Sequence, residues 1–214
     1  MNSFLRHAEP IIAAHLAPKV RRKWREFLRF DNELSSVLAK ASEPITAQLR
    51  LAWWRDEFGK LALERTPSVP LLDALGTNFD SEISNLSDLV DGYEAFALNE
   101  VYEGSSGVYA VSSGRKAALT AVCAMSNAAP EASALEAVAS SWTFAEYLRS
   151  DAHVSVHDEA RSIADRPRPS FPRSLRGFSI LDRLACRSIR RGGGPLMTTR
   201  GDAAAAMRIG LLGR

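Results

Sequence analysis

The sequence predicts an all-α protein with one hydrophobic core, and three observations support this class. Apolar residues recur at spacings of three and four through most of the chain, which is typical of amphipathic helices. No alternating apolar run is bracketed by hairpin turns, and prolines stand where several periodic segments begin. With 214 residues, 46% of them hydrophobic, the chain is large enough for a single domain spanning residues 1–214.

The first long helix is expected to start near Pro18, and its apolar stripe is interrupted by a carboxylate. The stripe consists of Val20, Trp24, Phe27, Leu34 and Leu38. Asp31 falls on the same stripe, where an unpaired charge would be costly. Asp31 therefore either lines a cavity or forms an ion pair with an arginine. We favour the ion pair, with Arg50 or Arg55 as the partner.

A second helix is expected to begin at Pro44 and to end before Pro67. Its apolar face is formed by Ala47, Leu51, Trp54, Phe58 and Leu61. The neighbouring residues Leu49, Ala52 and Trp53 are also apolar. A helix that is apolar on several sides is usually buried, so we expect this one to be central.

The remaining chain alternates between helical patterns and breaks. One or two helices are predicted within residues 73–99, and the glycines at 104 and 107 indicate either a break or close helix packing. Further helices are expected over residues 112–129, 130–148, 174–190 and 202–212. Residues 165–172 contain three prolines and must form a loop. Residues 192–200, which begin with three glycines, are expected to be a linker to a short C-terminal helix.

Charge and composition indicate where the protein is located and which partners it can bind. No apolar run is long enough to cross a membrane and no signal peptide is recognisable, so a cytoplasmic location is expected. Twelve arginines but only three aspartates lie from Arg161 onward. This basic quarter is either a solvated face or a surface for an acidic protein or a membrane, which would make the protein peripheral to the membrane. Nucleic-acid binding is not expected, because no recognised module accompanies the arginines.

Several motifs resemble the squalene/phytoene synthase family. The most specific is Leu-Arg-Leu-Ala-Trp-Trp-Arg-Asp-Glu-Phe at residues 49–58, preceded by Phe-Asp-Asn-Glu-Leu at residues 30–34. The likeness continues at residues 88–92, 147–149 and 172–176, and it is nearest to the short bacterial branch that resembles mitochondrial complex I assembly factor six. The resemblance implies an isoprenoid-synthase-like helical bundle with a central cavity for a prenyl chain.

The same resemblance implies that the two aspartate-rich motifs of the family are degenerate here. The acidic positions of the first motif fall on Ser35, Ser36 and Ala39, and those of the second on Ser150 and on His153 or Val154. Enzymes of the family need carboxylate pairs to bind Mg²⁺ and neutralise a departing diphosphate. We therefore expect a protein without prenyltransferase activity and without a cofactor, which binds a prenyl lipid or acts in assembly.

The alternative is an active Mg²⁺-dependent prenyltransferase that condenses prenyl diphosphates. It would use relocated carboxylates, namely Asp31, Glu33, Asp151 and Asp158. No catalytic residue and no metal ligand is assigned, and His153 with His157, four residues apart, lack further ligands. The candidate residues for a cavity or ligand site are Asp31, Glu33, Arg50, Trp53, Arg55, Asp56, Tyr147 and Arg149.

Overall fold

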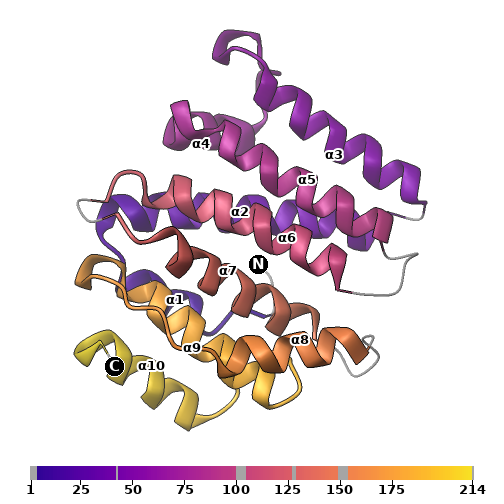
Figure 1. The fold of residues 1–214 in the computed structure, drawn as a ribbon. Helices are drawn as coiled ribbons and strands as arrows, with labels where there is room; N and C mark the ends of the chain where they lie inside the picture. The colour runs from indigo at the N-terminus through magenta and orange to yellow at the C-terminus, as the bar shows by residue number, and fades with distance from the viewer. Residues whose placement is uncertain (1–3, 42, 100–104, 127–128, 149–153, 214) are drawn as a thin grey trace.

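The computed structural model describes residues 4–41, 43–99, 105–126, 129–148 and 154–213, and it confirms the all-α prediction. The described residues form ten α-helices and three short 3₁₀ turns, without a strand (Figure 1). No helix in these ranges is both long enough and apolar enough to cross a lipid bilayer.

Six helices follow one another through the molecule as a stack. Each packs on the next in the order α3, α5, α6, α7, α9 and α10, so that α3 and α10 lie at opposite ends (Figure 1). Their bounds are Pro44–Gly59, Ser84–Asn99, Ser106–Cys123, Ala132–Tyr147, Arg176–Arg190 and Arg200–Leu212. The long helix α2 (Pro18–Lys40) packs across this stack and also contacts α4 (Pro70–Phe79). The short α1 (Glu9–Ala14) and α8 (Val154–Asp165) pack against α9.

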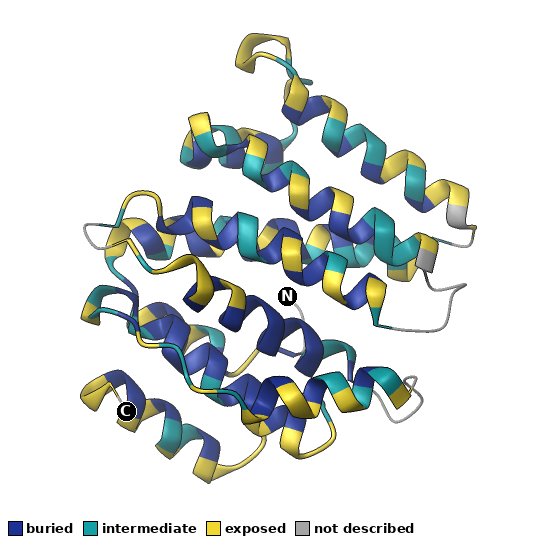
Figure 2. Ribbon diagram, viewed as in Figure 1, coloured by how far each residue is buried: buried dark blue, intermediate teal, exposed yellow. Residues whose placement is uncertain are grey.

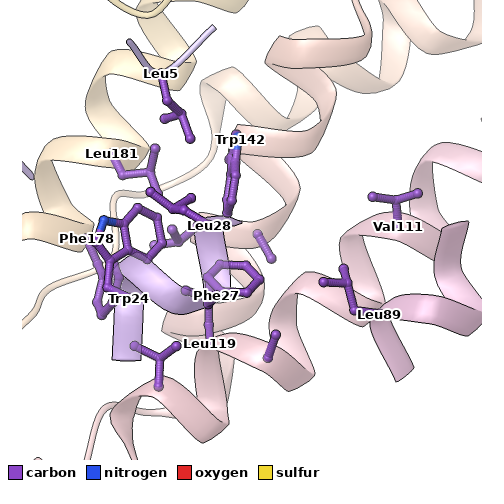
Figure 3. Close-up of a cluster of buried hydrophobic side chains, with 14 of the residues drawn as sticks. Leu5, Trp24, Phe27, Leu28, Leu89, Val111, Leu119, Trp142, Phe178 and Leu181 are labelled. Carbon is purple, nitrogen blue, oxygen red and sulfur yellow. The ribbon is translucent and has the colours of Figure 1, made fainter. Parts of the chain in front are cut away.

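The apolar stripe predicted for the first helix forms the centre of the core. Trp24 and Phe27 of α2 meet Trp142 of α7 and Phe178 of α9, with ring centroids 5.6 to 5.8 Å apart (Figure 3). All four side chains are completely buried. The tilted and edge-to-face arrangements are those that aromatic pairs prefer.

The prediction that the second helix is central is wrong. The central helix is α7, in which every residue from Ala137 to Ala145 is buried. The second helix, α3, lies at one end of the stack (Figure 2). Leu51 and Trp54 face the core, whereas Ile45 and Leu49 on the other side are 54% and 66% exposed. The apolar residues on several sides of α3 led to a wrong prediction of its place in the fold, because the side that carries Ile45 and Leu49 is exposed to solvent.

Helices α5 and α6 approach each other closely at two glycines. A Cβ atom on Gly92 would lie 2.6 Å from the carbonyl oxygen of Ala110, and one on Gly114 would lie 2.6 Å from the Cα atom of Leu89. Because these neighbours are backbone atoms, a larger residue would push the helices apart.

The connection after α3 is fixed by Glu57, a buried carboxylate. Its oxygens accept hydrogen bonds from Lys60 Nζ at 2.6 Å, from the Thr66 backbone N–H at 2.8 Å and from the Thr66 hydroxyl at 2.7 Å. These contacts, led by that of Lys60, lower the pKa of Glu57 to about 2. Glu57 thereby holds residues 60–66 against the end of α3.

Several predicted breaks are found, but some bounds differ. The second helix ends at Gly59, so Leu61 lies beyond it, and the helix expected over residues 112–129 is α6, which spans Ser106–Cys123. Residues 73–99 hold two helices, α4 and α5, and residues 166–172 form the expected loop. Gly192, Gly193 and Gly194 all have positive φ and make a tight turn before α10, which begins with a capping box between Thr199 and Asp202. Both cysteines are unpaired and buried.

Candidate functional site

Asp31 forms an ion pair with an arginine, but the partner is Arg115 of α6. Arg115 Nε donates to one carboxylate oxygen of Asp31 at 3.0 Å, and Nη2 donates to the other at 2.9 Å. Arg115 is completely buried and Asp31 is 2% exposed. This bidentate geometry suits a guanidinium and a carboxylate. The preference for an ion pair over a cavity-lining role agrees with the structure, whereas the partners proposed from sequence, Arg50 and Arg55, are wrong.

Arg50 and Arg55 fail as partners because α3 lies at the end of the stack. Arg50 points to solvent. Arg55 reaches α5 instead, where its Nε lies 2.8 Å from Asp91 and its Nη2 contacts Glu94. Arg115, in contrast, follows Val111 and precedes Leu119 by one helical turn each, which places it on the buried face of α6.

A second carboxylate approaches the same guanidinium from α7. Glu146 Oε2 lies 2.7 Å from Arg115 Nη2, in the geometry of an ion pair, and the Glu146 side chain is 12% exposed. Burial alone would lower the pKa of Arg115, but the charges of Asp31 and Glu146 outweigh burial and raise it well above the ordinary value. Two carboxylates thus share one buried cation. We call these three residues the Arg115 cluster.

Neutral side chains fill the space around the Arg115 cluster. Tyr93 donates its hydroxyl hydrogen to Asp31 at 3.0 Å, and Arg115 Nη1 donates to Thr143 Oγ1 at 3.3 Å. The guanidinium carbon lies 4.0 Å from the ring centroid of Trp142, a cation–π contact. Tyr93 thus contacts Asp31, whereas Thr143 and Trp142 contact the guanidinium of Arg115.

Tyr147, a candidate from the sequence, borders the cluster. Burial and the neighbouring charge of Glu146 raise the pKa of its hydroxyl, and burial and Asp31 do the same for Tyr93. Both phenols are therefore neutral donors at physiological pH. Among the sequence candidates that the structure describes, Asp31 and Tyr147 are the two that the fold brings together.

The other candidates lie apart from the cluster. Glu33 is exposed on α2, and Asp56 is exposed on α3. Trp53 is half-buried and stacks edge-to-face on Trp54, with centroids 4.9 Å apart. Arg149 lies outside the described residues.

An open groove of about 680 Å³ runs beside α2, and Glu33 lines it. Its apolar wall is made by Leu28, Trp54, Val69, Pro70 and Leu71, and its polar rim by Glu9, Arg25, Arg29, Asn32 and Glu33. An apolar wall with a few charged groups at its edge is typical of a small-ligand site. This groove, between α2 and the start of α4, is called the α2–α4 groove below.

The structure describes three of the four carboxylates proposed for a relocated magnesium site, namely Asp31, Glu33 and Asp158. Both oxygens of Asp31 are bound by Arg115, and Glu33 points to solvent two residues later. Asp158 pairs with Arg161 at 3.1 Å on the surface of α8, and Asp151 lies outside the described residues. Within the described ranges no three side chains of histidine, cysteine, aspartate or glutamate gather as a metal site would require.

Many of the C-terminal arginines make contacts within the protein. Asp182, 1% exposed, has Arg166 and Arg168 at 3.5 and 3.7 Å. Asp202 has Arg187 and Arg191 at 2.8 and 2.9 Å. Burial would raise the pKa of Asp202, but the hydrogen bonds from Arg187 and from residues 198 and 199 lower it overall. The basic surface is therefore smaller than the arginine count indicates.

Sequence reasoning missed Arg115, Tyr93 and Glu146. The signal for Arg115 is its place on the apolar stripe of α6, and that for Glu146 is its position four residues after Trp142.

Comparison of the chain with protein-family models, with curated proteins and with solved structures gave no match.

Proposed function

We propose that this chain is a squalene/phytoene synthase-like protein that binds a prenyl lipid without converting it. In this proposal the helical stack is a compact variant of the isoprenoid-synthase fold. The protein acts by binding this lipid, either alone or as a factor in the assembly of a larger complex.

The Arg115 cluster is the observation that carries this proposal. Diphosphate chemistry of this class requires carboxylates that are free to bind Mg²⁺ and a space that receives the leaving group. Here Asp31 of α2 and Glu146 of α7 both face a buried guanidinium. The guanidinium provides a fixed positive charge between the two helices. Tyr93 also donates a hydrogen bond to Asp31, and Thr143 and Trp142 contact the guanidinium.

The α2–α4 groove supports a lipid as the ligand. Its apolar wall suits an isoprenoid tail, and its volume is within the usual range of small-molecule sites, about 300–1,000 Å³. Arg25 and Arg29 at the rim suit an anionic or polar head group. Both arginines are more than half exposed and make surface ion pairs, with Glu9 and Glu26, that a ligand can replace at little cost.

Turnover and binding are tested separately. The purified chain is incubated with farnesyl or geranylgeranyl diphosphate, with and without Mg²⁺, and the products are analysed by mass spectrometry. We expect no condensed product and no release of diphosphate. A product that depends on Mg²⁺ would contradict the non-catalytic proposal.

Binding is measured by calorimetry with farnesol and with farnesyl diphosphate. We expect both to bind, and we expect Val69→Trp, which fills the α2–α4 groove from a half-buried position, to weaken binding about tenfold or more. The matched control is Ser133→Trp, which fills a second open groove of about 790 Å³ beside α7. Equal effects of the two variants, or no binding by the unaltered chain, would contradict a lipid site in the α2–α4 groove.

A further inference from the structure

The outer side of α10 exposes apolar and basic side chains together. Six of its exposed residues form two neighbouring lines with a spacing of four, namely Arg200, Ala204, Arg208 and Leu212, and Met207 and Leu211. We call these six residues the α10 face. Met207, Leu211 and Leu212 are 48%, 67% and 63% exposed. Neither arginine forms an ion pair with another described residue, so both guanidiniums are available to a ligand.

The inner side of α10 is fixed to α9. Asp202, the one acidic residue of α10, is completely buried and binds Arg187 and Arg191 at 2.8 and 2.9 Å. At the other end of the helix, Arg176 Nη1 donates to the carbonyl oxygen of Leu211 at 2.9 Å. These contacts hold α10 at the end of the stack, with the α10 face directed away from the core (Figures 1 and 2).

The C-terminal part of the chain, which includes α9 and α10, exposes positive charge only. Residues 166–213, all of which the structure describes, contain ten arginines and two acidic residues, Asp182 and Asp202. Both aspartates are buried, and each is faced by two arginines. The arginines that contact α10 add to the charge beside the α10 face. This surface is therefore complementary to an anionic partner.

From this combination we infer that the α10 face lies on an anionic lipid bilayer. Met207, Leu211 and Leu212 enter the upper part of the acyl layer, and Arg200 and Arg208 reach the head groups through their long apolar stems. An interfacial helix of this kind binds through its buried apolar area together with the attraction of basic side chains to anionic lipid. The protein rests on the bilayer by a surface separate from the α2–α4 groove.

The charges and the small apolar area favour a bilayer over a protein partner. A specific protein interface buries about 800 Å² on each partner, and three large apolar side chains in the last two turns of one helix supply only a part of this area. A protein partner also needs a carboxylate placed opposite each arginine, whereas the head groups of a fluid bilayer adjust to any spacing.

The same reasoning separates α10 from α3, the other helix with an exposed apolar side. Ile45 and Leu49 of α3 are 54% and 66% exposed. Asp56, three helical turns after Ile45, is exposed on the same side. An anionic surface repels this carboxylate, so α3 serves as the control.

Co-sedimentation of the full chain with lipid vesicles tests the inference. We expect binding to vesicles of phosphatidylcholine and phosphatidylserine in equal parts, weak binding to phosphatidylcholine alone, and less binding as the salt concentration rises. Leu211→Ser should weaken binding about tenfold and Arg208→Gln about fivefold, from the usual contribution of one apolar or basic side chain. The matched controls on α3 are Leu49→Ser and Arg50→Gln, and both should bind as the unaltered chain does. Leu49 and Leu211 are 66% and 67% exposed, so neither change should alter the circular dichroism spectrum.

A fluorescent label identifies the side of the protein that touches the bilayer. Both native cysteines are buried, so a maleimide dye attached to Met207→Cys reports from the α10 face. With anionic vesicles the emission of this dye should rise and move to shorter wavelength, as it does in an apolar environment. The same dye on Leu49→Cys, at the opposite end of the stack, should not respond.

Four results would overturn the inference. The first is a chain that does not bind the anionic vesicles, and the second is an equal loss of binding in the α10 and α3 variants. The third is a loss of vesicle binding in Val69→Trp with none in Leu211→Ser, which would assign the contact to the α2–α4 groove. The fourth is a chain that binds soluble poly-glutamate but no vesicle, which would assign the α10 face to an acidic protein.

Discussion

Replacing Arg115 by methionine removes the cation that Asp31 and Glu146 share. Methionine has a similar length, so the main loss is electrostatic. Breaking a buried ion pair by removing one partner costs about 3–5 kcal/mol, because a buried charge is left uncompensated. In Arg115→Met two carboxylates are left without the guanidinium, so we expect at least this loss in the free energy of unfolding at pH 7.

The loss should be visible in thermal and urea unfolding. For a chain of this size, 1 kcal/mol changes the melting temperature by about 2–4 °C, so a decrease of about 6–20 °C is expected. Buried carboxylates without a partner take up protons more readily, since burial raises their pKa. The deficit of Arg115→Met should therefore shrink as the pH is lowered from 7 to 5.

A triple variant separates charge from packing. Asp31→Asn and Glu146→Gln, added to Arg115→Met, leave a neutral cluster of similar volume. Replacement of a whole buried ion cluster is often close to neutral, so the triple variant should regain most of the lost stability. The reasoning is refuted if Arg115→Met costs less than about 1 kcal/mol at pH 7, or if the triple variant is no more stable than the single one.

Three further predictions concern other parts of the fold. Gly114→Ala should destabilise the protein by about 1–3 kcal/mol in urea unfolding because its Cβ atom would meet the backbone of α5, whereas Gly59→Ala, with no neighbour within 4 Å, should not; equal effects would argue against the close approach. Burial raises the pKa of Cys123 to about 12 and that of Cys186 to about 11, so a thiol reagent at pH 8 should label neither in the native protein and both in urea. The pKa of Glu57 is lowered from 4.5 to about 2, so its contribution is complete above pH 4.5 and is lost as the pH falls towards 2. The difference in urea midpoint between the unaltered chain and Glu57→Gln should therefore shrink between pH 6 and pH 3, and a constant difference would contradict this.

The helices of this fold are largely predictable from local sequence. The apolar stripe through Trp24 and Phe27 lies on α2, and the prolines at 44 and 130 stand at or just before the starts of α3 and α7. These signals depend only on neighbouring residues in the sequence. Two helices, α1 and α8 (Val154–Asp165), were not predicted. The six residues of α1 are too few to show a period.

The arrangement of the helices is not predictable in the same way. Apolar residues on several sides of α3 indicated burial, but Ile45 and Leu49 on one of these sides are exposed. For the same reason the sequence indicated that Asp31 needs an arginine without showing which one. The choice of Arg115 depends on α6 crossing α2, a contact between residues 84 positions apart.

Because Asp31 and Arg115 are 84 positions apart, the ribosome adds them to the chain at different times. Asp31 leaves the ribosome long before Arg115, and Glu146 follows later still. Until α6 has formed, the apolar stripe of α2 carries a charge that cannot be buried without a counterion. Before α6 is complete, this charge therefore disfavours burial of the α2 stripe against α1, α3, α4 or α5.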